Sequence, residues 1–581
     1  MKKNLKTILT VVLLISITSL CGLAEGKKPE KAKKTEPAKA KTKKSFFDER
    51  HMPVIEVTIA KKDWVKLCSE SREFVPSLVL ASPPRPFNYY RGDVKVDGKV
   101  FKSVGIRKKG FIGSLDGERP SLKIKFNQYQ KNGKYAGLDR LTLNNNKQDR
   151  AIVSQYLTYR LFRQVGVKAT RCNLCQVFVN GQNLGIYSNV ESVKPAFLKR
   201  NFGSAKGNLY EGTLADFYED RIDRFQKKNN KKKGKKRKDL LRVARALAKI
   251  KTNKKGDSTP VHQLVAIDDF LKFWAVESLV GFWDGYSSNQ NNFFVYMNPS
   301  DKKLHFIPWG ADSAFTDRRF MLFMDKYKSV NARGLLCNRL YNDPVVRMKY
   351  HQTLLGILKK QWNEKDLLAE IDRVEASVKD KLHRNQRGIR RALRSTRKFV
   401  KGRRASIMRE IRNGPVKVTT KAGRPAYMAE IGEMSGTFLT DWKTIKRPGK
   451  ISLIKAQGRI GKRKFELQQA KGDAKSARRR SPGMGVPPQL SASIEINGKR
   501  SSDARNTKIV LLFSRISLDA KNEEITITGQ MTEGSGFFSG FSAKPIAGHL
   551  TLIPDKDKKK PGKGSFSIKI YEMRNMFGRR D

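Results

Sequence analysis

Two polar loops in the middle of the chain carry side chains suited to phosphoryl transfer. The first loop contains Asp284, Asn291 and Asn292, and the second, further along the chain, contains Asp312. Phosphoryl transfer needs one carboxylate at the attacking hydroxyl, together with an amide and a second carboxylate that hold the magnesium ions bridging the nucleotide phosphates. Asp284, Asn292 and Asp312 have these chemistries. The sequence therefore predicts a catalytic loop followed by a metal-binding turn.

The elements that would position these loops follow from hydrophobic periodicity. Alternating patterns predict a β-rich region from about residue 52 to 190, in which the two-residue period turns Lys123 away from the apolar face of its strand. From about 191 to 415 the periodicity is helical, as in the apolar stripe of 267–279 just before the first loop. We expect that helix to present the loop.

The last part of the chain, 416–581, returns to short alternating strands separated by Gly, Pro and Lys turns. This spacing predicts an all-β sandwich or barrel-like module. The predicted fold class is therefore α+β, with a domain over 52–415 that is first β-rich and then α-rich, followed by the β module.

Several short motifs occur in order between about residues 53 and 414. They are Gly105-Ile106-Arg107-Lys108-Lys109-Gly110, Pro120-Ser121-Leu122-Lys123-Ile124-Lys125-Phe126, Gly137-Leu138-Asp139-Arg140-Leu141-Thr142-Leu143-Asn144-Asn145, Val179-Asn180-Gly181 and Gly207-Asn208-Leu209-Tyr210. Together with the two loops, they resemble the spore-coat-protein-H (CotH) kinase family, although the G-x-G-x-x-G, H-R-D and D-F-G strings of typical kinases are absent. The resemblance implies an atypical protein-kinase-like two-lobe fold and an enzyme that uses ATP and Mg²⁺ to phosphorylate Ser or Thr.

The resemblance also implies roles for single residues. Asp284 matches the aspartate that orients or deprotonates the acceptor hydroxyl. Asn292, with Asn291 as its neighbour, matches the asparagine on the metal side. Lys123 matches the strand lysine that contacts the nucleotide phosphates, and Arg107 is a further expected phosphate contact.

Two other assignments concern the nucleotide and the metal. Glu191 belongs to the segment between the lobes, where backbone groups would meet adenine. The metal turn departs from the family pattern Pro-Trp-Asp, because this chain has Pro308-Trp309-Gly310 and its next carboxylate is Asp312. One or two carboxylates with phosphate oxygens and waters satisfy Mg²⁺, so we predict that a tight glycine turn brings Asp312 to the metal.

Each of these residues also has an ordinary structural interpretation. An aspartate after a helix is typically a cap or turn residue, and adjacent asparagines are common turn formers. Lys123 on its own is typical of an exposed strand lysine. The ordered set of motifs favours the functional interpretation.

The N-terminus has the features of an export signal. Lysines precede an uncharged run and then small residues, which predicts a signal peptide over 1–24, followed by a disordered basic linker over 25–48. Lipid attachment at Cys21 is an alternative outcome of processing. No later segment has the roughly 20 apolar residues of a spanning helix, so we expect an exported protein that is periplasmic, on the cell surface or extracellular.

The remaining cysteines are too few for a disulfide scaffold. They are Cys68, Cys172, Cys175 and Cys337. Small buried side chains are the favoured interpretation, with a chance disulfide as the alternative and no second ligand pair for zinc.

The net charge of +66 predicts anionic partners. For an exported protein these are acidic or Ser/Thr-containing protein substrates or an anionic cell-surface polymer, and nucleic acid is not the expected physiological partner. The basic runs 227–238 and 556–560 concentrate this charge. A solvated basic surface without a dedicated ligand is the ordinary interpretation of such runs.

Two other functions stay open. Gly310 favours a catalytically impaired, pseudokinase-like envelope or surface protein that binds anionic polymers through its basic surface and β module. Phosphoryl or nucleotidyl transfer to a non-protein acceptor is the other possibility on the same scaffold, because a fold does not determine its acceptor.

Overall fold

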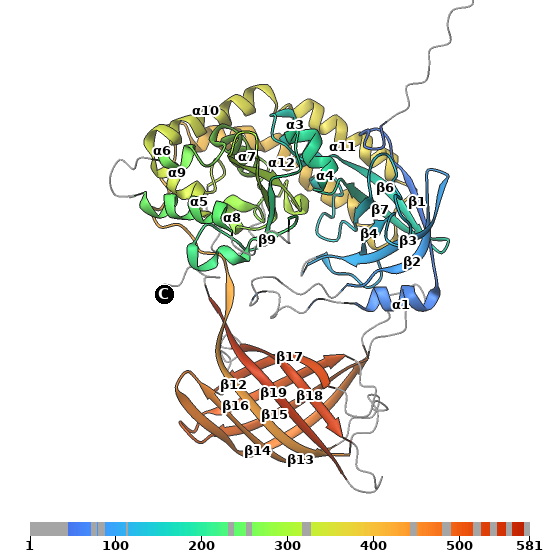
Figure 1. Ribbon diagram of the computed structural model, residues 1–581, viewed down its shortest axis with the longest axis vertical. Helices are drawn as coiled ribbons and strands as arrows, with labels where there is room; N and C mark the ends of the chain where they lie inside the picture. Colours follow the sequence, from blue (N-terminus) through green and yellow to red (C-terminus); the bar gives the residue numbers. More distant parts are fainter. Residues whose placement is uncertain are drawn as a thin grey trace, which may run out of the picture. The chain divides into compact units, whose positions relative to one another are not determined.

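The structure is a computed structural model with a mixed α+β fold (Figure 1). The residues that it describes are 45–70, 72, 78, 87–111, 114–230, 237–250, 258–316, 327–441, 450–478, 490–514, 524–534, 543–553 and 561–574. The predicted signal peptide, Cys21 and the basic run 556–560 lie outside these residues, as does the centre of the run 227–238. Among the described helices, none is long and apolar enough to cross a membrane.

The folded part of the chain starts before the predicted domain boundary at 52. Phe46 and Phe47 are both buried in the apolar core of the first barrel. The linker that we predicted to extend to residue 48 therefore ends earlier, because these two aromatic side chains pack in the core.

The predicted β-rich region is a closed barrel of seven strands. The order around the barrel is β1 (Val54–Ile59), β2 (Tyr90–Val96), β3 (Lys99–Lys109), β4 (Ser121–Lys125), β5 (Arg140–Asn144), β7 (Gln182–Val190) and β6 (Cys172–Val179). Helix α1 (Lys61–Ser69) follows the first strand. The pair β1–β6, which closes the barrel, is parallel. Because a strand directs alternate side chains to opposite faces, the barrel has an apolar inner face, and β6 and β7 also turn apolar side chains outward into the core of the helical region.

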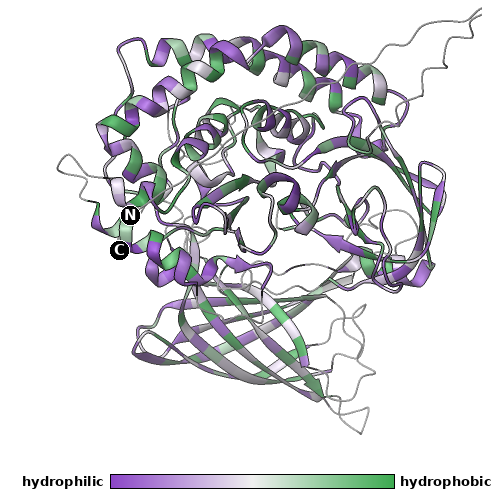
Figure 2. Cartoon of the chain, turned by 45° about the horizontal axis from the view of Figure 1, so that its top comes forward, coloured by the Kyte–Doolittle hydropathy of each residue, from purple (hydrophilic) through white to green (hydrophobic). Residues whose placement is uncertain are grey.

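The region that follows is mostly helical, as predicted. Its main helices are α4 (Pro195–Phe202), α5 (Lys238–Lys249), α7 (Ile267–Leu279), α9 (Leu335–Asn342), α10 (Pro344–Lys360), α11 (Glu364–Val378) and α12 (Ile389–Glu410). Helix α3 (Ser154–Gln164), which lies between β5 and β6 in the sequence, packs in the same core. Helix α7 is the centre of the core, since Trp274 is fully buried and its ring centroid lies 4.2 Å from that of Tyr350 in α10. Figure 2 shows the hydrophobic residues in green on the inward sides of the helices.

A small antiparallel sheet carries both predicted loops. Strands β10 (Phe293–Met297) and β11 (Leu304–Pro308) form a hairpin, and β8 (Asn208–Gly212) and β9 (Gln226–Lys227) complete the sheet in the order β11-β10-β8-β9. Phe293 pairs with Pro308 at the open end of the hairpin. The residues just before β10 and just after β11 are therefore neighbours, and these are the two loops.

The C-terminal strands form the second closed barrel, which is one of the two architectures predicted for this region. Its eight strands pair in sequence order, all antiparallel, and β12 closes on β19. They are β12 (Tyr427–Thr440), β13 (Ile451–Ile460), β14 (Arg463–Arg478), β15 (Leu490–Arg500), β16 (Asn506–Ser514), β17 (Glu524–Glu533), β18 (Lys544–Ile553) and β19 (Gly562–Arg574). Its interior is filled by aliphatic and aromatic side chains.

The four cysteines within the described residues are buried free thiols. Cys172 and Cys175 are only three residues apart, but they belong to the cores on opposite sides of β6. The period of the strand therefore keeps these two thiols apart.

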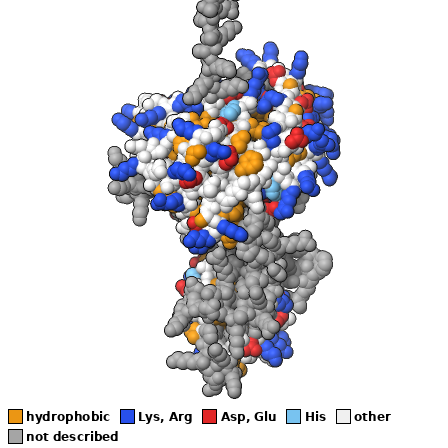
Figure 3. Space-filling model, turned by 90° about the vertical axis from the view of Figure 1, so that its right-hand side faces the viewer, with side chains coloured by type: hydrophobic (Ala, Val, Ile, Leu, Met, Phe, Trp, Pro, Cys, Tyr) orange, Lys and Arg blue, Asp and Glu red, His pale blue; other side chains and the backbone are white. Residues whose placement is uncertain are grey.

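Lysine and arginine side chains prevail over acidic ones on the face of the molecule drawn in Figure 3. This distribution agrees with the strongly positive net charge.

Candidate active site

Asp284 lies at the centre of a ring of asparagine amides. It follows α7 and precedes the one-turn helix α8 (Tyr286–Asn289). Its Oδ1 accepts hydrogen bonds from the side-chain amides of Asn289 (2.7 Å) and Asn291 (3.0 Å), and its Oδ2 accepts one from Asn292 (2.6 Å). Burial raises the pKa of Asp284, and the three amides oppose that shift. The polar residues of the loop thus hold one carboxylate in a defined orientation.

Glu277 holds the backbone of the loop through hydrogen bonds, a role that was not predicted from the sequence. This residue of α7 is fully buried, and its two carboxylate oxygens accept the backbone N–H groups of Tyr286 (3.0 Å) and Ser287 (2.8 Å). A Cβ at Gly285 would lie 2.3 Å from Oε1 of Glu277, so only glycine fits there. Burial, and to a lesser extent the charge of Asp284, raises the pKa of Glu277 to about 7. An acidic residue within an apolar helix was the signal that could have revealed it.

The hairpin β10–β11 brings Asn292 next to the metal turn. The backbone N–H of Trp309 donates to the carbonyl oxygen of Asn292 (3.1 Å). Asn292 and Gly310 both have left-handed backbones, with φ of 53° and 55°. Asparagine and glycine are the residues that most readily adopt this conformation. The two loops therefore turn sharply at the same end of the sheet.

Asp312 lies in the short 3₁₀ helix η3 (Ala311–Ser313) after this turn. Burial raises its pKa to about 7, assisted by the negative charges of Asp284 and Asp149 and opposed by Lys109. The structure thus brings the two predicted carboxylates, Asp284 and Asp312, within electrostatic range of each other. Two half-buried carboxylates that repel each other are well suited to a cation.

The predicted phosphate-binding residues share one face of the first barrel. In the β3–β4 ladder Arg107 pairs with Lys123, and Lys109 pairs with Ser121, so the three cations point to the same side. Lys108 points to the other side, where its ammonium donates to the carbonyl oxygens of Cys68 and Glu70. We call Arg107, Lys109 and Lys123 the cationic face.

The largest charge effects on Lys123 come from other cations. Burial, and then the charges of four cations, lowers its pKa well below the ordinary value. These cations are Arg107, Lys109, Arg140 and Lys194. An ammonium group surrounded by like charges is a place where an anion would be strongly stabilised.

Lys109 connects the cationic face with the acidic loops. Its ammonium donates a hydrogen bond to Oδ1 of Asn144 on β5. Burial lowers its pKa to about 8, opposed by the charge of Asp312 and assisted by Arg107. Lys109 was not among the residues that we predicted, although it lies two positions after Arg107 on the same strand.

Glu191 has a different environment from the one expected. Only 1% of its side chain is exposed, and its carboxylate receives hydrogen bonds from Arg171 (2.9 Å) and Arg200 (2.6 Å). Burial raises the pKa of Glu191, but these ion pairs outweigh burial and hold the pKa below its ordinary value. Its backbone N–H is also used, since it donates to the carbonyl of Arg171 (2.9 Å). The structure therefore gives Glu191 a role inside the protein.

The donor atoms at the two loops fit a magnesium ion. Within the part of the chain that is described, no three His, Cys, Asp or Glu side chains form a metal-binding group. The available oxygens are those of Asp284, Asp312 and Asn292, whereas Oδ1 of Asn291 accepts the backbone N–H of Leu214 (3.3 Å). Mg²⁺ is usually held by one or two carboxylates, with waters and substrate phosphates completing its shell.

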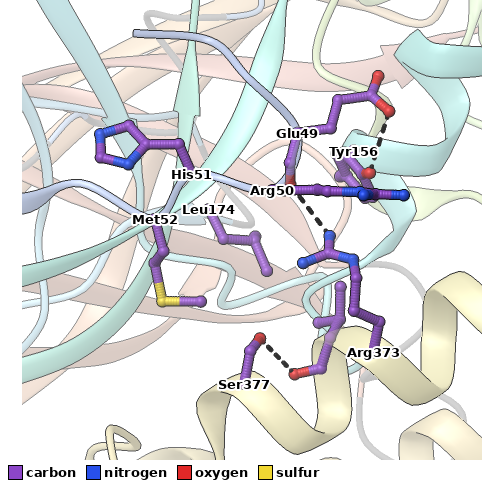
Figure 4. A pocket seen from close by; sticks show the side chains of 9 residues that line it. Glu49, Arg50, His51, Met52, Tyr156, Leu174, Arg373 and Ser377 are labelled. Atoms are coloured by element: carbon purple, nitrogen blue, oxygen red, sulfur yellow. Dashed lines mark hydrogen bonds between the residues drawn. The ribbon is translucent and has the colours of Figure 1, made fainter. Parts of the chain in front are cut away.

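A pocket elsewhere in the helical part is lined by none of these residues. It lies where the segment before β1 meets α3 and α11 (Figure 4). The hydroxyl of Tyr156 donates to Glu49 (3.3 Å), and Arg373 donates to the carbonyl oxygen of Glu49 (3.0 Å). These interactions attach the start of the folded chain to two helices, which is a structural role.

The comparisons with known proteins place the chain in a family. The family model described as "CotH kinase protein" matches residues 106–402, just over half of the chain, and the match includes both loops and the cationic face. The chain is 22% identical over 222 residues to invasin CotH7 of Rhizopus delemar, covering 36% of this chain and 37% of that protein. It is also 22% identical over 220 residues to spore coat protein homolog 1 of the same fungus, covering 36% of each.

A bacterial relative is matched over more of its length. The chain is 21% identical over 276 residues to inner spore coat protein H of Bacillus subtilis, covering 45% of this chain and 74% of that protein. The chain spans much less than two thirds of the two fungal relatives. Since the family model extends over more than half of the sequence, the chain belongs to the CotH family.

Proposed function

We propose that this chain is an exported kinase that uses ATP and Mg²⁺ to phosphorylate Ser or Thr of protein substrates. One observation supports the proposal most strongly. Lys109 of the cationic face lies within electrostatic range of Asp312, and Asp312 lies within electrostatic range of Asp284. Cations suit the nucleotide phosphates, and carboxylates suit the metal and the acceptor hydroxyl.

Asp284 would act on the acceptor hydroxyl. A carboxylate has about four lone-pair sites, and hydrogen bonds from three asparagine amides use three of them. The remaining site can accept the hydrogen bond of a substrate hydroxyl. As the hydroxyl oxygen bonds to the γ-phosphorus, the bond to the β–γ bridging oxygen breaks, ADP leaves, and Asp284 receives the proton.

Asp312 and the amide oxygen of Asn292 are the groups that would hold Mg²⁺. When bound, the ion would bridge the phosphates and offset their negative charge. Arg107, Lys109 and Lys123 would bind the phosphates from the other side. Because the pKa of Asp312 is raised to about 7, we expect proton and metal to compete for this carboxylate.

In this proposal the first barrel and the helical part act as the two lobes of an atypical kinase fold. The excess of cations favours acidic or already phosphorylated substrates. Relatives named spore coat proteins and invasins favour a surface or extracellular location, in agreement with the signal predicted from the sequence.

Gly310 supports a second candidate function, that of a catalytically impaired protein that binds anionic polymers. Relatives with Pro-Trp-Asp would have a carboxylate at this position, whereas this chain has none. In that case nucleotide binding would be lost or would not lead to turnover.

The deciding experiment is phosphate transfer from γ-labelled ATP to an acidic Ser-rich peptide in the presence of Mg²⁺. We expect transfer by the unchanged protein and its loss in Asp284→Asn and Asp312→Asn. Asp380→Asn is the matched control, since Asp380 is exposed on the surface. Transfer that persists in Asp284→Asn would refute the assigned role, and the absence of both transfer and ATP binding would favour the second candidate.

A further inference from the structure

Helix α12 (Ile389–Glu410) presents a face that carries only positive charge. From Arg384 to Arg409 the sequence contains no Asp or Glu. The opposite face of the helix is apolar and buried along its whole length, from Ile389 through Val400 to Ile407. The helix is therefore fixed lengthwise on the protein and exposes one side.

Some arginines of α12 have partners inside the protein. Arg397 forms ion pairs with Asp372 (2.5 Å) and Glu375 (2.6 Å) of α11. Arg403 is buried and donates to the carbonyl oxygen of Leu279 (2.8 Å) at the end of α7. These side chains lie on the flanks of the buried stripe, where they attach the helix to its neighbours.

Arg404 is also paired, with Glu364 (2.7 Å), and the remaining cations form a row along the exposed side of the helix. They are Arg390, Arg394, Lys398, Lys401 and Arg409, with Arg391 beside them and Arg387 just before the helix. Steps of three or four residues, with one step of eight before Arg409, keep them on one side of the helix, where Cβ atoms one short step apart are separated by about 6 Å. Within the described part of the chain, none of them forms an ion pair. Like charges at this spacing destabilise a helix, so an anion bound along the row would be stabilising.

We infer that this row, the α12 stripe, binds a linear polymer that carries regularly spaced phosphate groups. Five of the seven exposed cations are arginines. Arginine is a residue of choice for phosphate recognition, because its planar guanidinium group binds two phosphate oxygens through parallel hydrogen bonds. A row of charges on a rigid helix matches a chain that binds along it in single file.

The same geometry disfavours nucleic acid. A helix that reads a duplex enters the major groove, which is about 12 Å wide and accepts nearly the whole width of a helix. Because α12 packs against its neighbours along its whole length, only its exposed side is free to approach a groove. Single-stranded nucleic acids are bound by stacking on aromatic side chains, and Phe399, the aromatic residue of α12, is buried.

The test is binding of fluorescent inorganic polyphosphate to the full chain between about 50 and about 200 mM salt. The stripe variant is Arg390→Gln/Arg394→Gln/Lys398→Gln. The matched control is Lys61→Gln/Lys62→Gln/Lys66→Gln on the exposed side of α1, which lowers the net charge equally. We expect the stripe variant to bind about tenfold more weakly at the lower salt concentration. Its salt slope should be shallower by about 2, because each of the three cations removed contributes about 0.7 to that slope.

Three results would overturn the inference. They are an equal loss of affinity in both variants, equal affinity for polyglutamate of the same length, and tighter stripe-dependent binding of duplex DNA. Phosphate transfer at Asp284 should be unchanged in the stripe variant, so the two proposals can fail separately.

Discussion

The carboxamide of Asn292 occupies the space that a side chain at position 310 would need. A Cβ at Gly310 would lie 2.6 Å from Oδ1 of Asn292, and the backbone there has φ of +55°. Glycine at position 310 therefore leaves room for the side chain of Asn292. Asp312, two residues further on, is the carboxylate that approaches Asp284.

Substitution of Gly310 should be costly for two separable reasons. We expect Gly310→Ala to lower the free energy of unfolding by more than the about 1–2 kcal/mol of left-handed strain alone, because the methyl group also displaces Asn292. Two control variants separate these reasons. Gly137→Ala introduces left-handed strain at a position with open space, and Gly402→Ala introduces a methyl group into open space within α12 without that strain. Thermal unfolding of the three variants separates the two contributions.

Aspartate at position 310, as in the family pattern Pro-Trp-Asp, should not improve the metal site of this chain. We expect Gly310→Asp to reduce phosphate transfer, because its side chain would displace Asn292 from Asp284. An increase in transfer would show that the metal position is 310 and that Asp312 is not the ligand.

Glu277 should act as a positioning residue for the catalytic loop. Glu277→Gln turns an amide N–H₂ toward one of two backbone N–H groups, which costs about 1–3 kcal/mol in stability. We expect at least a tenfold fall in kcat (about 1.4 kcal/mol) with little change in the KM for ATP. Glu219→Gln, at an exposed position, is the control. A changed KM with normal kcat would contradict this role.

The charge of Asp312 should make stability depend on pH. Because its pKa is raised to about 7, the folded state holds the proton more tightly, and stability falls as the pH rises from about 4 to about 7. Asp312→Asn removes this loss, so its Tm relative to the unchanged protein should increase across that range.

Magnesium provides the complementary measurement. In the unchanged protein Mg²⁺ with a nucleotide should raise Tm more at pH 8 than at pH 5, because the ion competes with the proton. The same addition should have little effect on Asp312→Asn. An equal Tm gain in both proteins would exclude Asp312 as the ligand.

Lys123 should lower the stability of the nucleotide-free protein and strengthen its binding of ATP. We expect Lys123→Met to raise the Tm of the nucleotide-free protein, because repulsion from four neighbouring cations is removed. The same variant should lose most of the Tm gain on adding ATP, with a Kd raised about tenfold or more (about 1.4 kcal/mol). Lys134→Met, at an exposed position, should change neither. Normal ATP affinity in Lys123→Met would remove this lysine from the site.

Glu191 should matter for folding and not for nucleotide contact. Glu191→Gln leaves Arg171 and Arg200 without their buried partner, and we expect a cost of about 1–3 kcal/mol because water still reaches both arginines. Since the pKa of Glu191 is lowered in the fold, its stabilising effect is present near neutral pH and is lost in acid. We expect a lower Tm with an unchanged Kd for ATP; a raised Kd at unchanged Tm would restore the nucleotide role.

The sequence determined those features that depend on neighbouring residues. Periodicity located several strands of both barrels and helix α7, because a buried face repeats every two or about 3.6 residues. The ring around Asp284 was foreseeable, since Asn291 and Asn292 follow it closely in the same loop. The order of motifs correctly indicated the CotH family.

Only the tertiary structure decided which distant groups meet. Lys109 lies within electrostatic range of Asp312, and Glu191 forms ion pairs with two arginines. Glu277 accepts hydrogen bonds from the backbone of the loop, and one row of cations on α12 has no ion pair among the described residues. Periodicity tells which side of an element is buried, but not which partner that side will find. Partners depend on strand register and on helix packing between segments far apart in the chain, and the charges at this site are determined by those interactions.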